Sequence, residues 1–281
     1  MADRFYNRTA AIITKHGKER IIGPILWHAF NISLELARYD TDMLGTFSGE
    51  IERPTDQLGT ARLKIKQAES ISNASLLVAS EGAFHPHPDS PFITINTEII
   101  VLYDRKTQQE IISRNSSYNT NAAKITAKNL EELLEFVHTI GFPEHKVILM
   151  SNEELIRDRL VYKDIQDLDQ LIKSYLHITK TRGETVIAET DLRAMHNPTR
   201  QEQIRLTTEK LVALMQSECP ACHSPGYQIQ KTVAGLPCCW CNSPTANTLL
   251  EIYGCTVCGH TEQKRVAKPC ADPGTCDQCN P

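Results

Sequence analysis

Eight cysteines stand in four Cys-x-x-Cys pairs near the end of the chain, and they are the residues with the clearest chemistry. A two-residue gap lets both thiolates of a pair reach one tetrahedral Zn²⁺ ion, with Zn–S distances near 2.3 Å. Eight thiolates fill two four-coordinate sites and leave no position for a catalytic water, which is typical of structural zinc. The predicted ligands are Cys219, Cys222, Cys238, Cys241, Cys255, Cys258, Cys276 and Cys279.

The position of the cysteines also predicts a domain boundary. All ten cysteines of the chain lie from Cys219 onward. Thiols gathered at one end of a chain of ordinary composition are more typical of metal ligands than of disulfides. We therefore expect a small zinc-ribbon-type domain over residues 217–281, after a cysteine-free domain over residues 1–216.

The pairing of the four Cys-x-x-Cys knuckles is open at this stage. An interleaved arrangement joins the first knuckle to the third and the second to the fourth, whereas a sequential arrangement joins neighbours. The segment from Gly254 to Val266 resembles the second hairpin of a ribbon, which favours the interleaved form. Neither arrangement needs Cys239 or Cys270, and we expect these two to be packed or exposed thiols rather than ligands.

Charge limits the partners that we expect. The chain carries a formal net charge of −4, and the cysteine-rich module is close to neutral, so neither offers much counterion-release affinity for nucleic acid. Nucleic acid is therefore not a favoured partner. No apolar run approaches the roughly 18 residues of a membrane helix, and the N-terminus does not resemble a secretory signal. A cytoplasmic protein without membrane contact is expected, and an oligomer is compatible with the sequence.

The cysteine-free domain alternates apolar strand patterns with amphipathic helix patterns, which is typical of an α/β sheet covered by helices. A Gly23-Pro24 step is expected to interrupt the first helical pattern, and a long loop or hairpin is expected over residues 41–54. The expected strands are Thr9–Thr14, Ile32–Leu36, Leu76–Ser80, Ile99–Asp104, Glu110–Arg114, Val147–Met150 and Val186–Glu189. The expected helices are Lys18–Phe30, Asp56–Ser70, Asn129–Ile140, Asp167–Ile178 and Pro198–Gln216.

A candidate anion site lies between the first strand and the first helix. Thr14, His16 and Lys18 belong to a Gly-containing turn at a helix N-terminus, where backbone N–H groups can receive a phosphate. Strand-Gly-helix turns are also common without a ligand, and their lysines are then merely solvated. The turn alone therefore predicts only a position where a phosphate could bind.

Two further segments offer acidic and basic side chains. Glu81 follows the strand that ends at Ser80, and Glu50, Glu52 and Asp56 are the carboxylates that could share a Mg²⁺ ion with it, since Mg²⁺ prefers oxygen ligands. Later, the segment 189–200 holds two arginines and a histidine that could bind phosphate: Arg193, Arg200 and His196. A helix start capped by Asn197, with Pro198 in its first turn, is the simpler interpretation of this segment.

The loop after Glu81 contains His85, His87 and Asp89 in a His-x-His-x-Asp pattern. These residues could form a second metal site for a transition ion. Alternation of histidine with proline is also compatible with a rigid loop that binds nothing. We favour the rigid loop.

Four short segments resemble, in the same order, those of the inosine/xanthosine triphosphate pyrophosphatase family. TKHGKERII is similar to that family's opening strand–helix turn, with His16 where the family has Asn. TDQLGTARLKIKQA is similar to its acidic-plus-helix motif and aligns Asp56, Arg62 and Lys64 with it. LLVASEGAF resembles its acidic turn at Glu81, and HNPTRQEQI resembles a late element that starts a helix with His196 and Arg200.

The resemblance implies a mixed-sheet α/β fold with flanking helices, a nucleotide in a central cleft between two lobes, and Mg²⁺ held by carboxylates. Together with the acidic and basic residues described above, it leads us to expect catalysis by Glu81, Asp56 and Glu52, and nucleotide binding by the set Thr14, His16, Lys18, Arg62, Arg193, His196 and Arg200. The sequence departs from that family at His16 and at Ser80, where a second acidic residue is usual. The whole chain also resembles an uncharacterised bacterial family.

The sequence therefore leads to one functional expectation and one alternative. The expectation is a metal-dependent, nucleotide-processing hydrolase of the nucleoside triphosphate pyrophosphatase type, with two structural Zn²⁺ ions and a catalytic Mg²⁺. The alternative is a non-hydrolytic nucleotide- or nucleic-acid-binding protein with a structural zinc module. Patterns typical of P-loop NTPases, Rossmann dehydrogenases, serine hydrolases and zincins do not occur in the sequence.

Overall fold

The computed structural model describes residues 4–37, 39, 55–88, 90–153, 158–183 and 185–280. The expected loop over residues 41–54, with Glu50 and Glu52, lies outside the described residues, and so does Asp89. The chain forms two compact units, Met1–Lys210 and Leu211–Pro281. The division falls within helix α5 (Pro198–Gln216), whose last residue is also the end of the predicted first domain.

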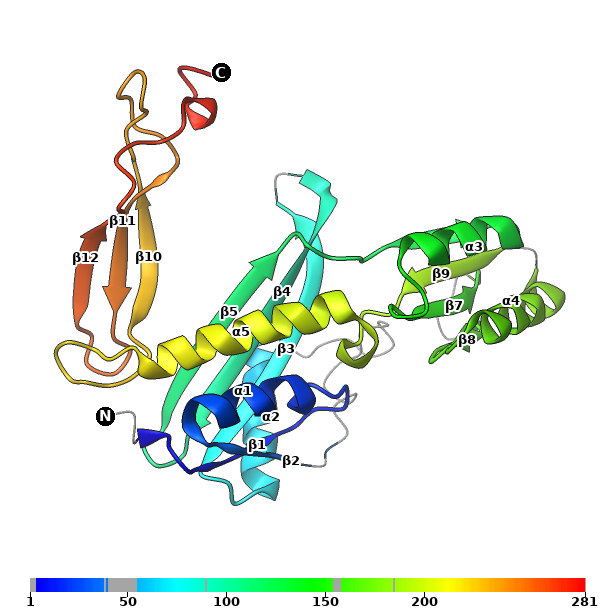
Figure 1. The fold of residues 1–281 in the computed structure, drawn as a ribbon, viewed down its shortest axis with the longest axis horizontal. Helices are drawn as coiled ribbons and strands as arrows, with labels where there is room; N and C mark the ends of the chain where they lie inside the picture. The colour runs from blue at the N-terminus through cyan, green and yellow to red at the C-terminus, as the bar shows by residue number, and fades with distance from the viewer. Residues whose placement is uncertain are drawn as a thin grey trace. The chain divides into compact units, whose positions relative to one another are not determined.

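The first unit contains a five-stranded mixed sheet in the order β2-β1-β3-β4-β5 (Figure 1). Its strands are β1 (Thr9–Ile12), β2 (Ser33–Leu36), β3 (Leu76–His87), β4 (Ser90–Asp104) and β5 (Gln109–Ser117). β1 runs parallel to β2 and β3, whereas β3, β4 and β5 are antiparallel neighbours. The expected mixed α/β fold with a mixed sheet and flanking helices is thus confirmed.

Helix α2 (Gln57–Ile71) covers one face of this sheet because its apolar side chains recur at helical spacing. Ala61, Ile65 and Ala68 are buried against alternate residues of the strands, among them Ala79 and Val101. The Asp56 carboxylate caps the helix by accepting a hydrogen bond of 2.7 Å from the Gly59 N–H. The first residue of α2, Gln57, lies beside Glu81 of β3, since its side-chain amide donates to the Glu81 carbonyl oxygen.

Helix α1 (Glu19–Phe30) continues through Pro24, so the expected interruption at Gly23-Pro24 is wrong. Proline removes one backbone hydrogen bond from a helix, but it does not end a helix whose buried face is intact. Ile22, Leu26 and Phe30 form such a face, on both sides of Pro24.

The Pro- and His-rich segment after Glu81 is also not the loop that we expected. β3 continues to His87 and pairs with β4 down to Ser90, so Glu81 lies inside the strand opposite Ile99 rather than at its end. The long β4 supplies a partner residue opposite each residue of this extension, and the ladder is irregular between Pro86 and His87.

A second sheet of the first unit has the order β6-β9-β7-β8 (Figure 1). Its strands are β6 (Lys124–Ala127), β7 (Val147–Ser151), β8 (Val161–Tyr162) and β9 (Val186–Thr190). Helices α3 (Leu130–Thr139) and α4 (Leu168–Arg182) pack on this sheet through a shared apolar core. Strand periodicity does not show which strands share a sheet, so the division into two sheets was not predicted.

The second unit contains an antiparallel sheet in the order β10-β11-β12, formed by Gln228–Ala234, Thr248–Gly254 and Thr261–Arg265. Most residues of β10 and all of β12 are exposed, so this sheet encloses little apolar core. Two 3₁₀ helices complete the description, η4 (Ala194–His196) in the first unit and η5 (Pro273–Thr275) in the second. Among the described residues, no helix is both long and apolar enough to cross a membrane.

Candidate metal clusters and a buried charge cluster

The eight predicted metal ligands lie in two groups of four. The first cysteine cluster consists of Cys219, Cys222, Cys255 and Cys258, and the second of Cys238, Cys241, Cys276 and Cys279. Within each cluster all four sulfur atoms lie within 4.8 Å of one another. This is the interleaved arrangement. The first cluster joins the knuckle before β10 to the knuckle between β11 and β12, and the second joins the knuckle between β10 and β11 to the knuckle after β12.

The sulfur–sulfur distances fit a tetrahedral metal. A Zn–S distance near 2.3 Å gives a tetrahedron with an edge of about 3.8 Å between sulfur atoms. In the first cluster the Cys219–Cys258 and Cys222–Cys255 distances are 3.7 and 3.6 Å. In the second, the Cys238–Cys279 and Cys241–Cys276 distances are 3.8 and 3.6 Å. Both clusters are therefore compatible with a structural metal such as zinc.

Local backbone geometry explains why the two-residue gap works. In each knuckle the residue after the second cysteine donates its N–H to the carbonyl oxygen of the first, as His223 does to Cys219 and Gly259 to Cys255. Three of these residues, His223, Asn242 and Gly259, adopt a left-handed backbone conformation. Asparagine and glycine adopt this conformation readily. The tight turn leaves both thiols of a knuckle pointing to the same side.

Within each cluster, hydrogen bonds favour the thiolate form of one cysteine, Cys222 or Cys241, whereas contacts with neighbouring thiols help to raise the pKa of another, Cys258 or Cys279, to about 12. Ser224 lowers the pKa of the Cys222 thiol to about 6, and Ser243 does the same for Cys241. Both serines stand two residues after the second cysteine of their knuckle. The matched environments show that the two knuckles are built in the same way.

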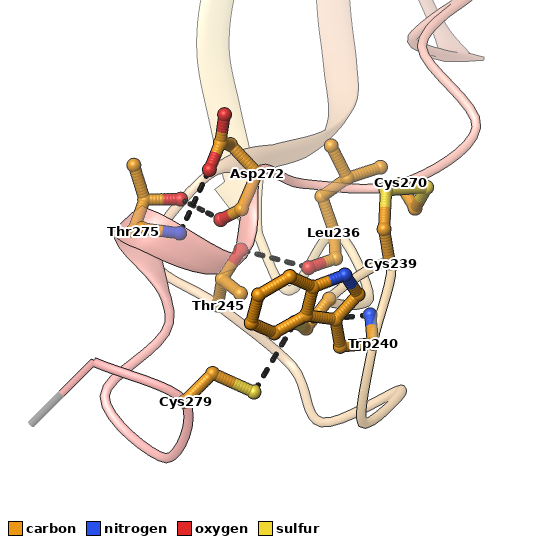
Figure 2. Close-up of a disulfide and its surroundings, with 10 residues drawn as sticks. Leu236, Cys239, Trp240, Thr245, Cys270, Asp272, Thr275 and Cys279 are labelled. Carbon is orange, nitrogen blue, oxygen red and sulfur yellow. Dashed lines mark hydrogen bonds between the residues drawn. A yellow bond between two sulfur atoms is a disulfide. The ribbon is translucent and has the colours of Figure 1, made fainter.

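Cys239 and Cys270 differ from the expectation that they are spare thiols. They form a disulfide across a sequence separation of 31 residues, in the loops that also carry the second cluster (Figure 2). Their separate positions in the sequence gave no sign that the fold places them together. The parallel bridge between Cys238 and Ala271 brings the two segments together, and Cys239 and Cys270 are the immediate chain neighbours of these two residues.

A buried charge cluster in the first unit begins at the turn after β1. Lys18 is only 4% exposed, and its ammonium group lies 3.1 Å from both the carbonyl and the hydroxyl oxygen of Ser80 and 3.6 Å from the Glu98 carboxylate. Burial lowers the pKa of the Lys18 ammonium to about 7, and Glu98 opposes this only in part. A lysine in this state can gain or lose its proton near neutral pH.

Arg200 completes the opposite side of the cluster. Its guanidinium lies 2.7 Å from the Glu98 carboxylate, and both side chains are fully buried. A second nitrogen donates to the carbonyl oxygen of Leu192 at 2.6 Å. Gly82 makes this arrangement possible, since a Cβ there would lie 2.2 Å from both the Arg200 guanidinium and the Glu98 carboxylate.

The start of α2 contributes the third side. Lys64 lies 2.5 Å from the Glu81 carboxylate, and both are largely buried. The Gln57 side-chain amide donates to the carbonyl oxygens of Glu81 and Thr97 at 3.0 and 2.8 Å, which attaches α2 to β3 and β4. Three basic groups (Lys18, Lys64 and Arg200) thus surround two carboxylates (Glu81 and Glu98).

All four segments that resemble the pyrophosphatase family therefore contribute to one region. Lys18, Glu81 and Arg200 of the predicted site meet in the charge cluster, and Asp56 caps the helix that delivers Lys64. Gly17 of the first turn lies near Met195, which directly precedes the last segment, since a Cβ at Gly17 would be 3.7 Å from Met195 Cβ. Thr14 and His16 belong to the same turn and are half-buried.

The other predicted site residues lie elsewhere. Arg62 forms an exposed ion pair with Glu110 and does not join the cluster. Arg193 binds the Asp191 carboxylate at 2.6 Å and Asp164 at 2.9 Å, and His196 binds Asp164 at 2.7 Å. Arg193 is thus held by Asp191 of its own segment and by Asp164, which precedes α4, and His196 contacts the same Asp164 carboxylate. Glu52 lies outside the described residues.

The predicted Mg²⁺ set is not assembled by the described residues. Glu81 is paired with Lys64, and the Asp56 carboxylate caps α2. Within the described ranges, neither belongs to a group of three or more potential metal ligands. A third group of potential ligands consists of Asp164, Asp191 and His196. Both of its carboxylates are paired with the Arg193 guanidinium. The described residues therefore do not form a Mg²⁺ site around Glu81.

The histidines of the β3 extension do not form a metal site with each other in the described part of the chain. His85 Nε2 lies 3.1 Å from the Thr97 hydroxyl, and the His87 ring packs at 5.6 Å from that of Tyr118. A cavity of about 670 Å³ lies at the opposite end of β1 from the charge cluster, where Arg8, Ser75 and Lys106 are among its lining residues. The expected central cleft remains a prediction.

The sequence alone did not point to Glu98, nor to a role for Ser80 or Lys64. Glu98 directly precedes the apolar run Ile99–Leu102 of β4, and it is 0% exposed. A charge beside such a run is unusual in a buried strand unless it is paired, and that was the available signal. The identity of its partners, Lys18 and Arg200, depends on the fold alone.

Comparison with known proteins defines the family but not an activity. A family model described as "Domain of unknown function (DUF6671)" matches residues 64–281, and the chain belongs to this family. No curated protein matches the chain. The crystal structure of protein VC0702 from Vibrio cholerae is similar at 10% identity and a TM-score of 0.34, over 73% of this chain and 94% of that chain.

Proposed function

We propose that the first unit binds a nucleoside triphosphate beside the buried charge cluster and releases pyrophosphate from it. The observation that carries this proposal is the composition of the cluster, where Lys18, Lys64 and Arg200 face only two carboxylates and burial lowers the pKa of Lys18 to about 7. A buried ammonium without a full counter-charge is costly, and a bound anion would favour the charged form of Lys18. The resemblance of four segments to the pyrophosphatase family supports a nucleotide as the source of that anion.

The two lysines and the arginine would have different tasks. Arg200 is engaged by Glu98 and by the Leu192 carbonyl, so it positions the cluster rather than the substrate. Lys18 and Lys64 carry point charges at the ends of flexible side chains and can turn toward phosphate oxygens. If Lys64 moves to a phosphate, the Glu81 carboxylate is released and can accept a proton from a water molecule. Mg²⁺ would enter on the phosphates of the nucleotide.

A specific observation favours the alternative of binding without hydrolysis. In the described part of the first unit, Glu81 is neutralised by Lys64 and no group of three metal ligands surrounds it. A site in this state can hold an anion without activating water. The two proposals share a binding site and differ only in turnover.

Hydrolysis can be measured on purified protein. With Mg²⁺ and a panel of nucleoside triphosphates, pyrophosphate release is expected for at least one nucleotide, and Glu81→Gln should abolish it. Glu202→Gln is a matched control, because Glu202 is an exposed carboxylate paired with Arg205 on α5. Nucleotide binding without pyrophosphate release would leave the binding alternative standing and overturn the hydrolase.

For the second unit we propose two structural Zn²⁺ ions, one in each cysteine cluster. Four cysteine sulfurs at tetrahedral distances are typical of zinc, and they also suit iron. Metal analysis of protein purified without added metal is expected to give two zinc ions per chain. Two iron ions per chain, or a metal-free folded protein, would contradict this assignment.

A further inference from the structure

The Cys239–Cys270 disulfide joins the same two segments that supply the second cysteine cluster. Cys239 lies inside the knuckle formed by Cys238 and Cys241, and Cys270 precedes the knuckle formed by Cys276 and Cys279. Figure 2 shows the disulfide with Trp240 of the first segment and Cys279 of the second. A metal in the second cluster and the disulfide would therefore be two cross-links between one pair of segments.

Backbone hydrogen bonds hold the two segments in register between these cross-links. The Cys239 N–H donates to the Ala271 carbonyl oxygen at 3.0 Å, and the Ala271 N–H donates to the Pro237 carbonyl oxygen at 2.8 Å. The disulfide thus keeps both knuckles of the second cluster close together whether or not a metal is present. The first cluster has no disulfide between its segments in the described chain.

The two residues of the disulfide differ in exposure. Cys239 is exposed, whereas Cys270 is half-buried. An attacking thiolate would reach the Cys239 sulfur more easily, with the Cys270 thiolate as leaving group. The bond is therefore open to exchange with thiols in solution, unlike a disulfide enclosed in an apolar core.

We propose that Cys239 and Cys270 are a reversible thiol–disulfide site that sets how firmly the second cysteine cluster holds its metal. This inference rests on the proposed zinc content of the clusters. With the disulfide closed, the ligand segments are already joined, so the cluster reassembles readily after a ligand dissociates. With the disulfide open, only the metal and a few hydrogen bonds join them, and the metal is lost more easily.

The chemistry is a balanced two-electron exchange. A dithiol attacks the Cys239 sulfur through one thiolate, forms a mixed disulfide and releases the Cys270 thiolate. Its second thiol then displaces Cys239. The dithiol loses two electrons and two protons and becomes a disulfide, and Cys239 and Cys270 become thiols. A low-molecular-weight disulfide reverses the reaction.

The test is thiol alkylation followed by mass spectrometry of the whole zinc-loaded chain, after equilibration with a low-molecular-weight disulfide. Cys239 and Cys270 should resist alkylation before reduction and react after it. A water-soluble phosphine is a suitable reductant, since it offers no thiolate to zinc. It becomes a phosphine oxide with the oxygen of one water molecule, whose two protons complete the two thiols.

Zinc release is then followed in the same protein by adding a chelator and alkylating the exposed ligand cysteines over time. After reduction, the second cluster should lose zinc at least roughly tenfold faster, which is less than the full effect of closing a loop of this length. The first cluster is the internal control and should be unchanged. The double variant Cys239→Ser with Cys270→Ser should release zinc at the fast rate without reductant.

Two results would overturn the inference. One is alkylation of Cys239 and Cys270 without any reduction, which would show that the disulfide does not form. The other is equal zinc release from the second cluster before and after reduction. A protein that binds no zinc in either state would contradict the zinc assignment as well, whereas two bound zinc ions with redox-independent release would contradict this inference alone.

Discussion

Glu98 is a fully buried carboxylate that contacts two cations, Lys18 and Arg200. Pairs of this kind contribute little when both members are present, because desolvation offsets their attraction. Removing one member is a different matter, since it leaves the other charge buried and unpaired. The stability of the first unit therefore depends on the cluster being complete.

Arg200→Gln should destabilise the first unit by about 3–5 kcal/mol, because Glu98 loses its closest partner while it stays fully buried. Arg205→Gln is the matched control on the same helix. Arg205 pairs with Glu202 and Glu209 at the surface, and exposed pairs contribute less than about 1 kcal/mol. Urea unfolding of both variants measures the difference. Equal urea midpoints for the two variants would show that the buried pair contributes no more to stability than the exposed pair.

Lys18 should make stability depend on pH. Its folded-state pKa of about 7 lies below the ordinary lysine value of 10.5, so the unfolded chain binds more protons between these pH values. Stability should therefore rise with pH across this window, by up to about 1.4 kcal/mol per unit. Lys18→Met removes the group, so the stability of the wild type relative to the variant should increase from pH 7 to 9. Parallel pH curves would contradict the burial of a titrating lysine.

At this scale the sequence predicted some residues of the cluster and none of its pairs. Lys18, Glu81 and Arg200 were candidates because they stand beside strand–helix junctions. Glu98 was missed because it stands alone beside the apolar residues of β4. The pairing of Lys64 with Glu81 depends on how α2 is placed along β3. The knuckle cysteines are different, since a two-residue gap itself fixes the local geometry.

At the scale of elements, β3 and β4 carry the cluster because they continue past the ends that periodicity predicts. Gly82 lies where β3 passes between Arg200 and Glu98. Gly82→Ala would place a methyl group 2.2 Å from both side chains, which have no exposed route by which to move away. We expect a loss of about 1–3 kcal/mol in the stability of the first unit.

Gly183→Ala is a comparison for Gly82→Ala, since a Cβ there meets nothing within 4 Å, although its positive φ of 115° adds strain of its own. Thermal unfolding of both variants separates crowding from backbone strain. An unchanged melting temperature for Gly82→Ala would show that the Arg200–Glu98 pair adjusts without cost.

Helices were predicted better than strands, for a physical reason. The expected limits of α5 agree with the structure, since Asn197 caps the helix and Pro198 occupies its first turn. The extension of β3 through His87 depends on its pairing with β4, and the residues of segment 84–87 do not by themselves predict that pairing. Strand length is thus a property of the sheet more than of the local sequence.

At the scale of the whole molecule, the two compact units have different sources of stability. The first has two apolar cores on its two sheets, whereas the strands of the second are mostly exposed. A domain with so little core depends on its cross-links.

Removal of zinc by a chelator together with reduction should unfold the second unit and leave the first folded. Hydrogen exchange of peptides measures this directly. Peptides from β10, β11 and β12 should lose most of their protection, and those from β3 and β4 should keep theirs. Loss of protection in both units together would contradict independent stability.

We propose that a nucleotide binds beside the buried charge cluster, and calorimetric titration with nucleoside triphosphates measures this binding. Lys64 and Lys66 lie on the same helix, but Lys64 pairs with Glu81 whereas Lys66 is exposed. The wild-type protein should bind at least one nucleotide. Lys64→Met should weaken binding at least tenfold, or about 1.4 kcal/mol, and Lys66→Met should change it less than about twofold. Absence of binding to every nucleotide, or an equal effect of the two substitutions, would contradict the claim.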